Sequence, residues 1–167
     1  MLLGAVRCNM FMTALILIFS TGLFFFYFQV VCQKILRRQF AQPFWQAISH
    51  ANRLEFPSVR KALEGFGVPV DYPRLMLSLR CDFLALTYLA KNAANVNRRY
   101  TCEERILIVY FKLILVSLVT RHWLRLREKP AALKLAAILE YFGNVVGERV
   151  NRLRFGNLTA ADYLVNL

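Results

Sequence analysis

The sequence has few of the residues from which metal centres and acid–base sites are built. It contains two histidines, His50 and His122, and only ten acidic residues against 22 basic ones. No C-x-x-C pair occurs among its four cysteines, which are Cys8, Cys32, Cys81 and Cys102. Neither the histidine nor the cysteine spacing is that of a metal site or a disulfide scaffold. We therefore expect free, mostly buried thiols and no bound metal.

Nucleotide and catalytic motifs are also absent. The chain has no G-x-S-x-G, no Walker loop, no G-x-G-x-x-G and no signature of a nucleic-acid-binding module. We accordingly expect no catalytic residue and no cofactor, and we do not expect a nucleic acid as partner. The net charge of +12 and the apolar fraction of 57% together exclude a disordered composition.

Charged residues are missing from residues 10–32. A helix of these 23 positions is about 35 Å long, which is enough for the ~30 Å hydrocarbon core of a bilayer. The run is longer than the ~7–15 residues of a signal-peptide core and ends without a small-x-small cleavage site. It predicts an uncleaved transmembrane signal anchor, with residues 1–9 as a short non-cytoplasmic tail. The same lack of charge and histidine argues against an ion pathway or a haem ligand in this helix.

Basic residues follow the apolar run at once and set its orientation. Lys34, Arg37 and Arg38 lie in a basic juxtamembrane helix predicted over residues 33–42. Positive charge marks the cytoplasmic side, so we expect residues 43–167 to lie in the cytoplasm and the span to lie in the inner membrane of a bacterium. With Tyr27, these three basic residues are the expected membrane-interface residues.

The aromatic run within the span allows two interpretations. Phe24 and Phe25 belong to five consecutive aromatic residues in its inner half. Consecutive residues point around the whole helix, which favours lipid contact. The small residues at 20–22 would let another membrane helix approach closely, so Phe24 and Phe25 are also candidate partner-binding residues.

The rest of the chain shows helical rather than strand periodicity. We expect an all-α protein, with the N-terminal transmembrane helix followed by a compact cytoplasmic bundle of four or five helices over residues 43–167. The expected helices cover residues 43–54, 58 to 65 or 67, 72–93, 102–127 and 130–154, with a short one opening at the capping box of residues 159–162.

The helix over 102–127 has the strongest start signal, because Thr101 and Glu104 match a capping box. Its middle is apolar on every face except for Lys112 and Ser117. A helix of this kind is a buried central helix or a membrane segment. Its apolar stretch is short for a span, so we expect it at the centre of the bundle, with a second span or a re-entrant helix as the alternative.

Three charged residues stand in apolar helical stretches, namely Asp82, Lys112 and Glu140. Buried charges need partners. We expect Lys112 to pair with one of the two acids in a buried charge pair, or to extend its ammonium to the surface. A proton-handling role for such a pair is the less favoured alternative.

Two further features are candidate partner-binding sites. Gly143 and Gly147 lie one turn apart and permit close helix packing. Basic clusters lie at the two ends of the helix over 102–127, and their candidate residues are Arg98, Arg99, Arg121, Trp123 and Arg125. Tryptophan among arginines also suits a membrane interface.

These patterns predict a non-catalytic single-pass membrane subunit that anchors, scaffolds or helps assemble a larger complex through helix–helix contacts. The expected partners are other membrane protein subunits and anionic lipid headgroups, and a homo-oligomer is compatible with the same surfaces. The alternative is a lipid-binding or membrane-shaping protein that uses its basic faces, and the second alternative is a membrane-bound helical enzyme with an unrecognised site.

Overall fold

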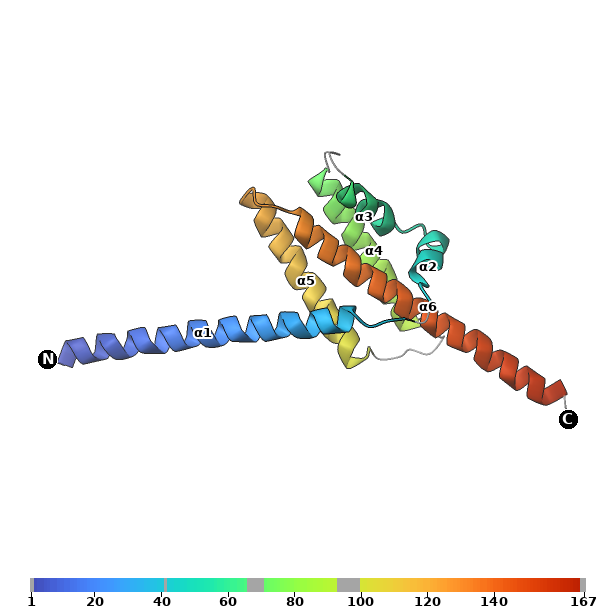
Figure 1. Cartoon of the computed structure of the whole chain (residues 1–167), viewed down its shortest axis with the longest axis horizontal. Coiled ribbons are helices and arrows are strands. Elements are labelled where there is room, and N and C mark those ends of the chain that lie inside the picture. The colour runs from blue at the N-terminus through green and yellow to red at the C-terminus, as the bar shows by residue number, and fades with distance from the viewer. Residues whose placement is uncertain (1, 41, 66–70, 93–99, 166–167) are drawn as a thin grey trace. The chain divides into compact units, whose positions relative to one another are not determined.

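The computed structural model describes the chain except residues 1, 41, 66–70, 93–99 and 166–167, and it describes side chains within residues 12–152 outside these gaps. The described part is all-α, as predicted. Its six helices are α1 (Leu2–Leu36), α2 (Trp45–Ala51), α3 (Phe56–Glu64), α4 (Tyr72–Asn92), α5 (Cys102–Trp123) and α6 (Lys129–Val165) (Figure 1). The chain divides into two units, Met1–Arg38 and Gln39–Leu167.

The N-terminal unit is the single long helix α1. Its segment Met12–Leu36 is long and apolar enough to cross a membrane, and most of its described side chains are exposed. The hydroxyl of Thr21 donates to the carbonyl of Leu17 at 2.7 Å, so this polar group is satisfied within the helix. The predicted helix over residues 33–42 is wrong beyond Leu36, where α1 ends in a turn.

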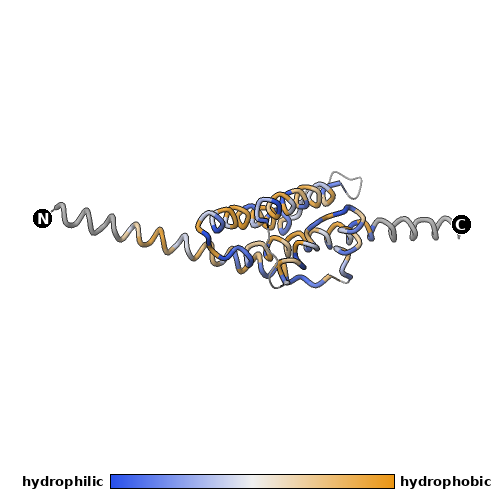
Figure 2. Tube along the Cα trace, turned by 90° about the horizontal axis from the view of Figure 1, so that it is seen from above, coloured by the Kyte–Doolittle hydropathy of each residue, from blue (hydrophilic) through white to orange (hydrophobic). Residues whose placement is uncertain are grey.

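The second unit is a bundle organised around α6. This helix contacts α2, α3, α4 and α5. Figure 2 shows orange and blue segments alternating along the bundle helices, as expected for helices with one apolar face. Aromatic rings join three of them, because Phe83 stacks on Phe111 with centroids 3.8 Å apart and meets Phe142 edge-on at 5.9 Å. The centre of the bundle is therefore α6.

The prediction that the helix over 102–127 forms the centre is wrong. α5 buries one face only, through Glu104, Leu107, Tyr110, Phe111, Ile114 and Leu118. Its opposite face is exposed although it is also apolar. Hydrophobicity on every side does not require burial on every side, because the neighbouring helices cover only one side of α5.

The C-terminal part of the chain also differs from the expectation. α6 runs without a break from Lys129 to Val165, so no separate helix begins at the second capping box. The helix was expected to end at residue 154, just before Phe155 and Gly156. A glycine inside a helix costs only about 1 kcal/mol relative to alanine, which is too little to break α6 by itself.

Candidate functional site

Asp82 has a structural partner that the sequence did not indicate. Its side chain is buried, and Oδ2 accepts hydrogen bonds from the backbone N–H groups of Glu55 at 2.9 Å and Phe56 at 2.6 Å. Burial raises the pKa of Asp82, while these two amide bonds act in the opposite direction. Asp82 on α4 thus caps the start of α3, which begins at Phe56 and not at the predicted Ser58.

The predicted pair among Asp82, Lys112 and Glu140 does not form. Glu140 on α6 accepts from Arg60 of α3, and Arg60 also bonds Glu64 at 2.9 Å. The hydrogen bond that Arg60 donates to Glu64 is the main cause of the raised pKa of Arg60. Lys112 is exposed on the outer face of α5. The structure thus agrees with the second expectation for Lys112, in which its ammonium extends to the surface.

A buried ion pair that sequence analysis missed joins α5 to α6. The capping box is confirmed, because Thr101 N–H donates to Glu104 Oε2 at 3.1 Å and Thr101 Oγ1 accepts from Glu104 N–H at 3.3 Å. The other carboxylate oxygen of Glu104 accepts from Arg149, which also donates to the carbonyl of Ala90 on α4. The side chains of Glu104 and Arg149 are only 3% and 13% exposed. The capping bond uses only one carboxylate oxygen of Glu104, and the other oxygen, once buried, needs a donor of its own. This unmet need was the one feature of the sequence that could have pointed to a basic partner for Glu104.

The small residues of α6 are covered from within the same chain. A Cβ built on Gly143 would lie 3.0 Å from Trp45 Cβ, and one on Gly147 would lie 2.1 Å from Phe44 Cβ. Between them, Asn144 Oδ1 accepts from the backbone N–H of Trp45 at 2.9 Å. Close packing at the two glycines is as predicted. Their neighbour is the start of α2, so this surface is already occupied in the bundle.

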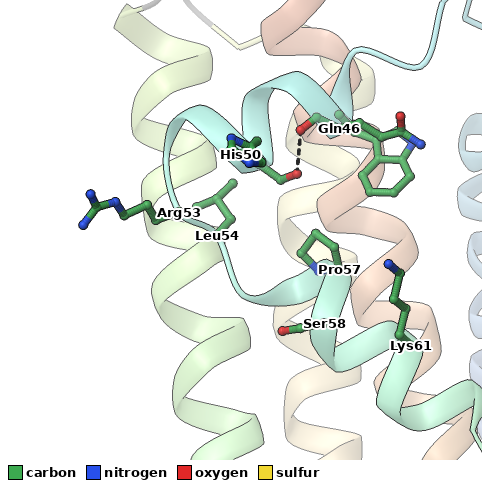
Figure 3. A pocket seen from close by; sticks show the side chains of 9 residues that line it. Gln46, His50, Arg53, Leu54, Pro57, Ser58 and Lys61 are labelled. Carbon is green, nitrogen blue, oxygen red and sulfur yellow. Dashed lines mark hydrogen bonds between the residues drawn. The ribbon is translucent and has the colours of Figure 1, made fainter.

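An open cavity of about 600 Å³ lies beside α2 and α3. Figure 3 shows its walls, which carry basic and polar side chains but no acid. The hydroxyl of Ser49 donates to the carbonyl of Gln46 at 2.9 Å, and His50 is exposed at the rim. The lining residues are Trp45, Gln46, Ser49, His50, Arg53, Leu54, Pro57, Ser58 and Lys61.

The outward face of α4 carries a stripe of exposed apolar residues. Leu77, Leu84 and Tyr88 are 64%, 62% and 68% exposed, and the exposed Cys81 lies between them at helical spacing. Cys102 is exposed as well, so the expectation of mostly buried thiols is wrong for Cys81 and Cys102. Sequence analysis missed this stripe, which is offset around the helix from the buried residues of α4, such as Leu79 and Leu86.

The outward face of α5 carries a matching stripe. Val109, Leu113 and Val116 are 50%, 42% and 62% exposed. We call these residues, with Leu77, Cys81, Leu84 and Tyr88, the α4/α5 stripes. Exposed cations lie on the same two helices, namely Arg74, Arg80, Lys91, Arg105 and Lys112.

The predicted partner-binding residues near the end of α5 are largely at the surface. Trp123 is 83% exposed, Arg125 is exposed and Arg121 is half-buried. Arg98 and Arg99 lie outside the described residues. The predicted residues of the span and its interface are exposed: Phe24, Phe25, Tyr27 and Lys34 lie on α1, and Arg37 and Arg38 follow its end.

Known proteins provide no further constraint on the site. No family model, curated protein or solved structure matches the chain significantly. Among the described residues, no group of three or more histidine, cysteine, aspartate or glutamate side chains is placed to hold a metal ion. The candidate site consists of the exposed apolar residues of the α4/α5 stripes.

Proposed function

We propose that this chain is a membrane-anchored, non-catalytic subunit that holds another membrane protein against the α4/α5 stripes. The observation that carries the proposal is the exposure of apolar residues at helical spacing on two helices whose opposite faces are already packed. Exposed apolar residues grouped along one face of a helix mark an interface. Their spacing fits a helix lying along that face.

The charges around the stripes favour a partner of different sequence. The exposed charged residues along the stripes are mostly basic, as at Arg80 and Lys112. A second copy of the chain would bring these cations toward one another, which disfavours self-association. The fitting occupant is an apolar helix flanked by acidic residues.

The segment Met12–Leu36 supplies the anchor in this proposal. Its length and composition suit a single span, and Lys34, Arg37 and Arg38 are exposed at its C-terminal end. Positive charge at that end favours an orientation with the bundle on the cytoplasmic side. Tethering in the same membrane raises the effective concentration of the bundle near a membrane-protein partner.

Charge substitutions within the stripes test the proposal. We expect Leu84→Glu and Val116→Glu to abolish a complex that the native chain forms in mild detergent and that survives high salt, since an apolar interface is insensitive to ionic strength. Val150→Glu is the matched control, because Val150 is an exposed apolar residue on α6 outside the stripes. The readout is the protein mass of the solubilised complex by light scattering. A native chain that is a monodisperse monomer, or a homo-oligomer, would contradict the proposal.

A further inference from the structure

A second surface lies at the turn between α5 and α6, which is the tip of this hairpin in Figure 1. We call residues 121–127 the α5–α6 corner. Trp123, Leu124 and Leu126 are 83%, 53% and 55% exposed there. Three of the four residues 123–126 therefore expose large apolar side chains.

Hydrogen bonds order the backbone of the corner. Arg125 N–H donates to His122 O at 3.1 Å and Leu126 N–H donates to Arg121 O at 2.8 Å, the pair of bonds that closes a Schellman motif. The guanidinium of Arg121 donates to Arg127 O at 3.1 Å. The corner thus displays its apolar side chains from a fixed turn.

Side chains that lie outside the corner, those of Glu128 and Tyr72, contact His122 within it. His122 Nδ1 lies 2.7 Å from Glu128 Oε1, and the His122 ring stacks on Tyr72 at 3.7 Å. These contacts tie the end of α5 to the start of α4. The turn is held without help from the side chains of the three exposed apolar residues, so the exposure of these side chains is not needed to form it.

The end of α2 provides an internal comparison. It closes with the same two bonds, from Arg53 N–H to His50 O at 3.4 Å and from Leu54 N–H to Ser49 O at 3.0 Å. Arg53 and Arg125 both have a φ of 51°. Leu54 is half-buried in the bundle, whereas its counterpart Leu126 is exposed. The motif therefore does not dictate an exposed leucine.

The charges of the corner are arranged for an anionic surface. Arg121, Arg125 and Arg127 lie among the exposed apolar residues. The neighbouring acid, Glu128, faces His122. A compact tip with three apolar residues is small against the ~800 Å² that a stable protein interface buries on each partner. Tryptophan with arginine is typical of the headgroup region of a bilayer.

We propose that the α5–α6 corner binds the surface of an anionic bilayer. Trp123, Leu124 and Leu126 enter the headgroup region, and Arg125 and Arg127 pair with lipid phosphates. This contact is separate from the protein partner proposed for the α4/α5 stripes. It would give the bundle a defined side toward the membrane in addition to its covalent tether.

The test uses the full chain in vesicles that contain lipids brominated on their acyl chains. The sequence has two tryptophans, so the difference between the native chain and Trp123→Phe reports on Trp123 alone. We expect brominated lipids to quench Trp123 in anionic vesicles and to quench it less in neutral ones. Arg127→Gln should lower the ratio of inserted to free corner about fivefold, because a basic residue contributes on the order of a factor of five at such a surface.

A tryptophan elsewhere on the bundle is the control. Val150→Trp in the Trp123→Phe background places the same fluorophore at an exposed site of α6, and it should escape quenching by brominated lipids. Trp123 that is open to aqueous acrylamide and insensitive to brominated lipids would overturn the proposal. If Trp123 is shielded from both acrylamide and brominated lipids, the corner is covered by protein, and the proposal is overturned as well. A loss of this shielding when the protein is diluted in lipid would identify the cover as another protein molecule.

Discussion

The covered face of α6 and the outward faces of α4 and α5 both carry apolar residues at helical spacing, yet they differ in their polar contacts. On α6, Asn144 and Arg149 reach partners on α2, α4 and α5, and glycines let α2 approach. The charged residues near the α4/α5 stripes, such as Arg80 and Lys112, are exposed. A face built for its own chain holds satisfied polar groups in its middle, whereas the charges of these outward faces point away from the bundle.

Removing the buried cation of the covered face should have the largest effect. Arg149→Met leaves Glu104 buried without its partner, and breaking such a pair costs about 3–5 kcal/mol. The free energy of unfolding in detergent, followed by helicity, is the measurement. Arg152→Met is the control, because Arg152 pairs with Glu148 at the surface, where a pair contributes about 0–1 kcal/mol. Equal losses in the two variants would show that the buried pair is not a special contact.

Alanine substitutions at the glycines of α6 should have the second-largest effect on the unfolding free energy. Gly147→Ala places a methyl group 2.1 Å from Phe44 Cβ, and overpacking of this kind costs about 1–3 kcal/mol. Gly143→Ala should cost less, since its nearest atom is at 3.0 Å. Gly22→Ala has nothing within 4 Å and should leave the bundle unchanged. The three unfolding free energies should follow this order, and a uniform gain from helix propensity would refute the packing described for α2.

The pH dependence of Asp82 should give a smaller effect. Asp82→Asn keeps an acceptor oxygen and removes the charge. Because burial raises the pKa of Asp82 above its ordinary 3.8, the folded chain holds this proton more tightly than the unfolded chain. The contribution of the carboxyl is complete below about 3.8 and is lost as pH rises through the folded pKa. We expect the unfolding free energy of the native chain, relative to Asp82→Asn, to fall with rising pH in a titration monitored by helicity; a rise would contradict the effect of burial.

The smallest effect on stability should come from the open face. Leu84→Ser should change the unfolding free energy by no more than about 0.5 kcal/mol, since Leu84 is 62% exposed. Leu86→Ser, two residues along the same helix, should cost several kcal/mol because Leu86 is fully buried. Comparable losses in a denaturation experiment would mean that the outer face of α4 is also packed within the chain.

Local signals in the sequence predicted much of the secondary structure. The capping box at Thr101 and Glu104, the long apolar helix α1 and the small-residue spacing of Gly143 and Gly147 all depend on residues near one another in sequence. They were readable because the residue types themselves set the local geometry.

Contacts between residues far apart in the chain could not be predicted from the sequence. The starts of α2 and α3 are capped by Asn144 and Asp82, which lie 99 and 27 residues from Trp45 and Glu55. Charge alone could not show that Glu140 pairs with Arg60 rather than with Lys112. The centre of the bundle was misplaced for the same reason, since an apolar helix does not reveal how many of its sides its neighbours cover.

The most direct test of the proposed docking surface is site-specific photo-crosslinking in native membranes. A photoreactive amino acid at Leu84 or at Val116 should crosslink to one membrane protein of different sequence, through an apolar helix with acidic neighbours identified by mass spectrometry. The same group at Val150 should give no such adduct. Crosslinks at Leu84 and Val116 to lipid alone, to a second copy of this chain, or to nothing would contradict the account.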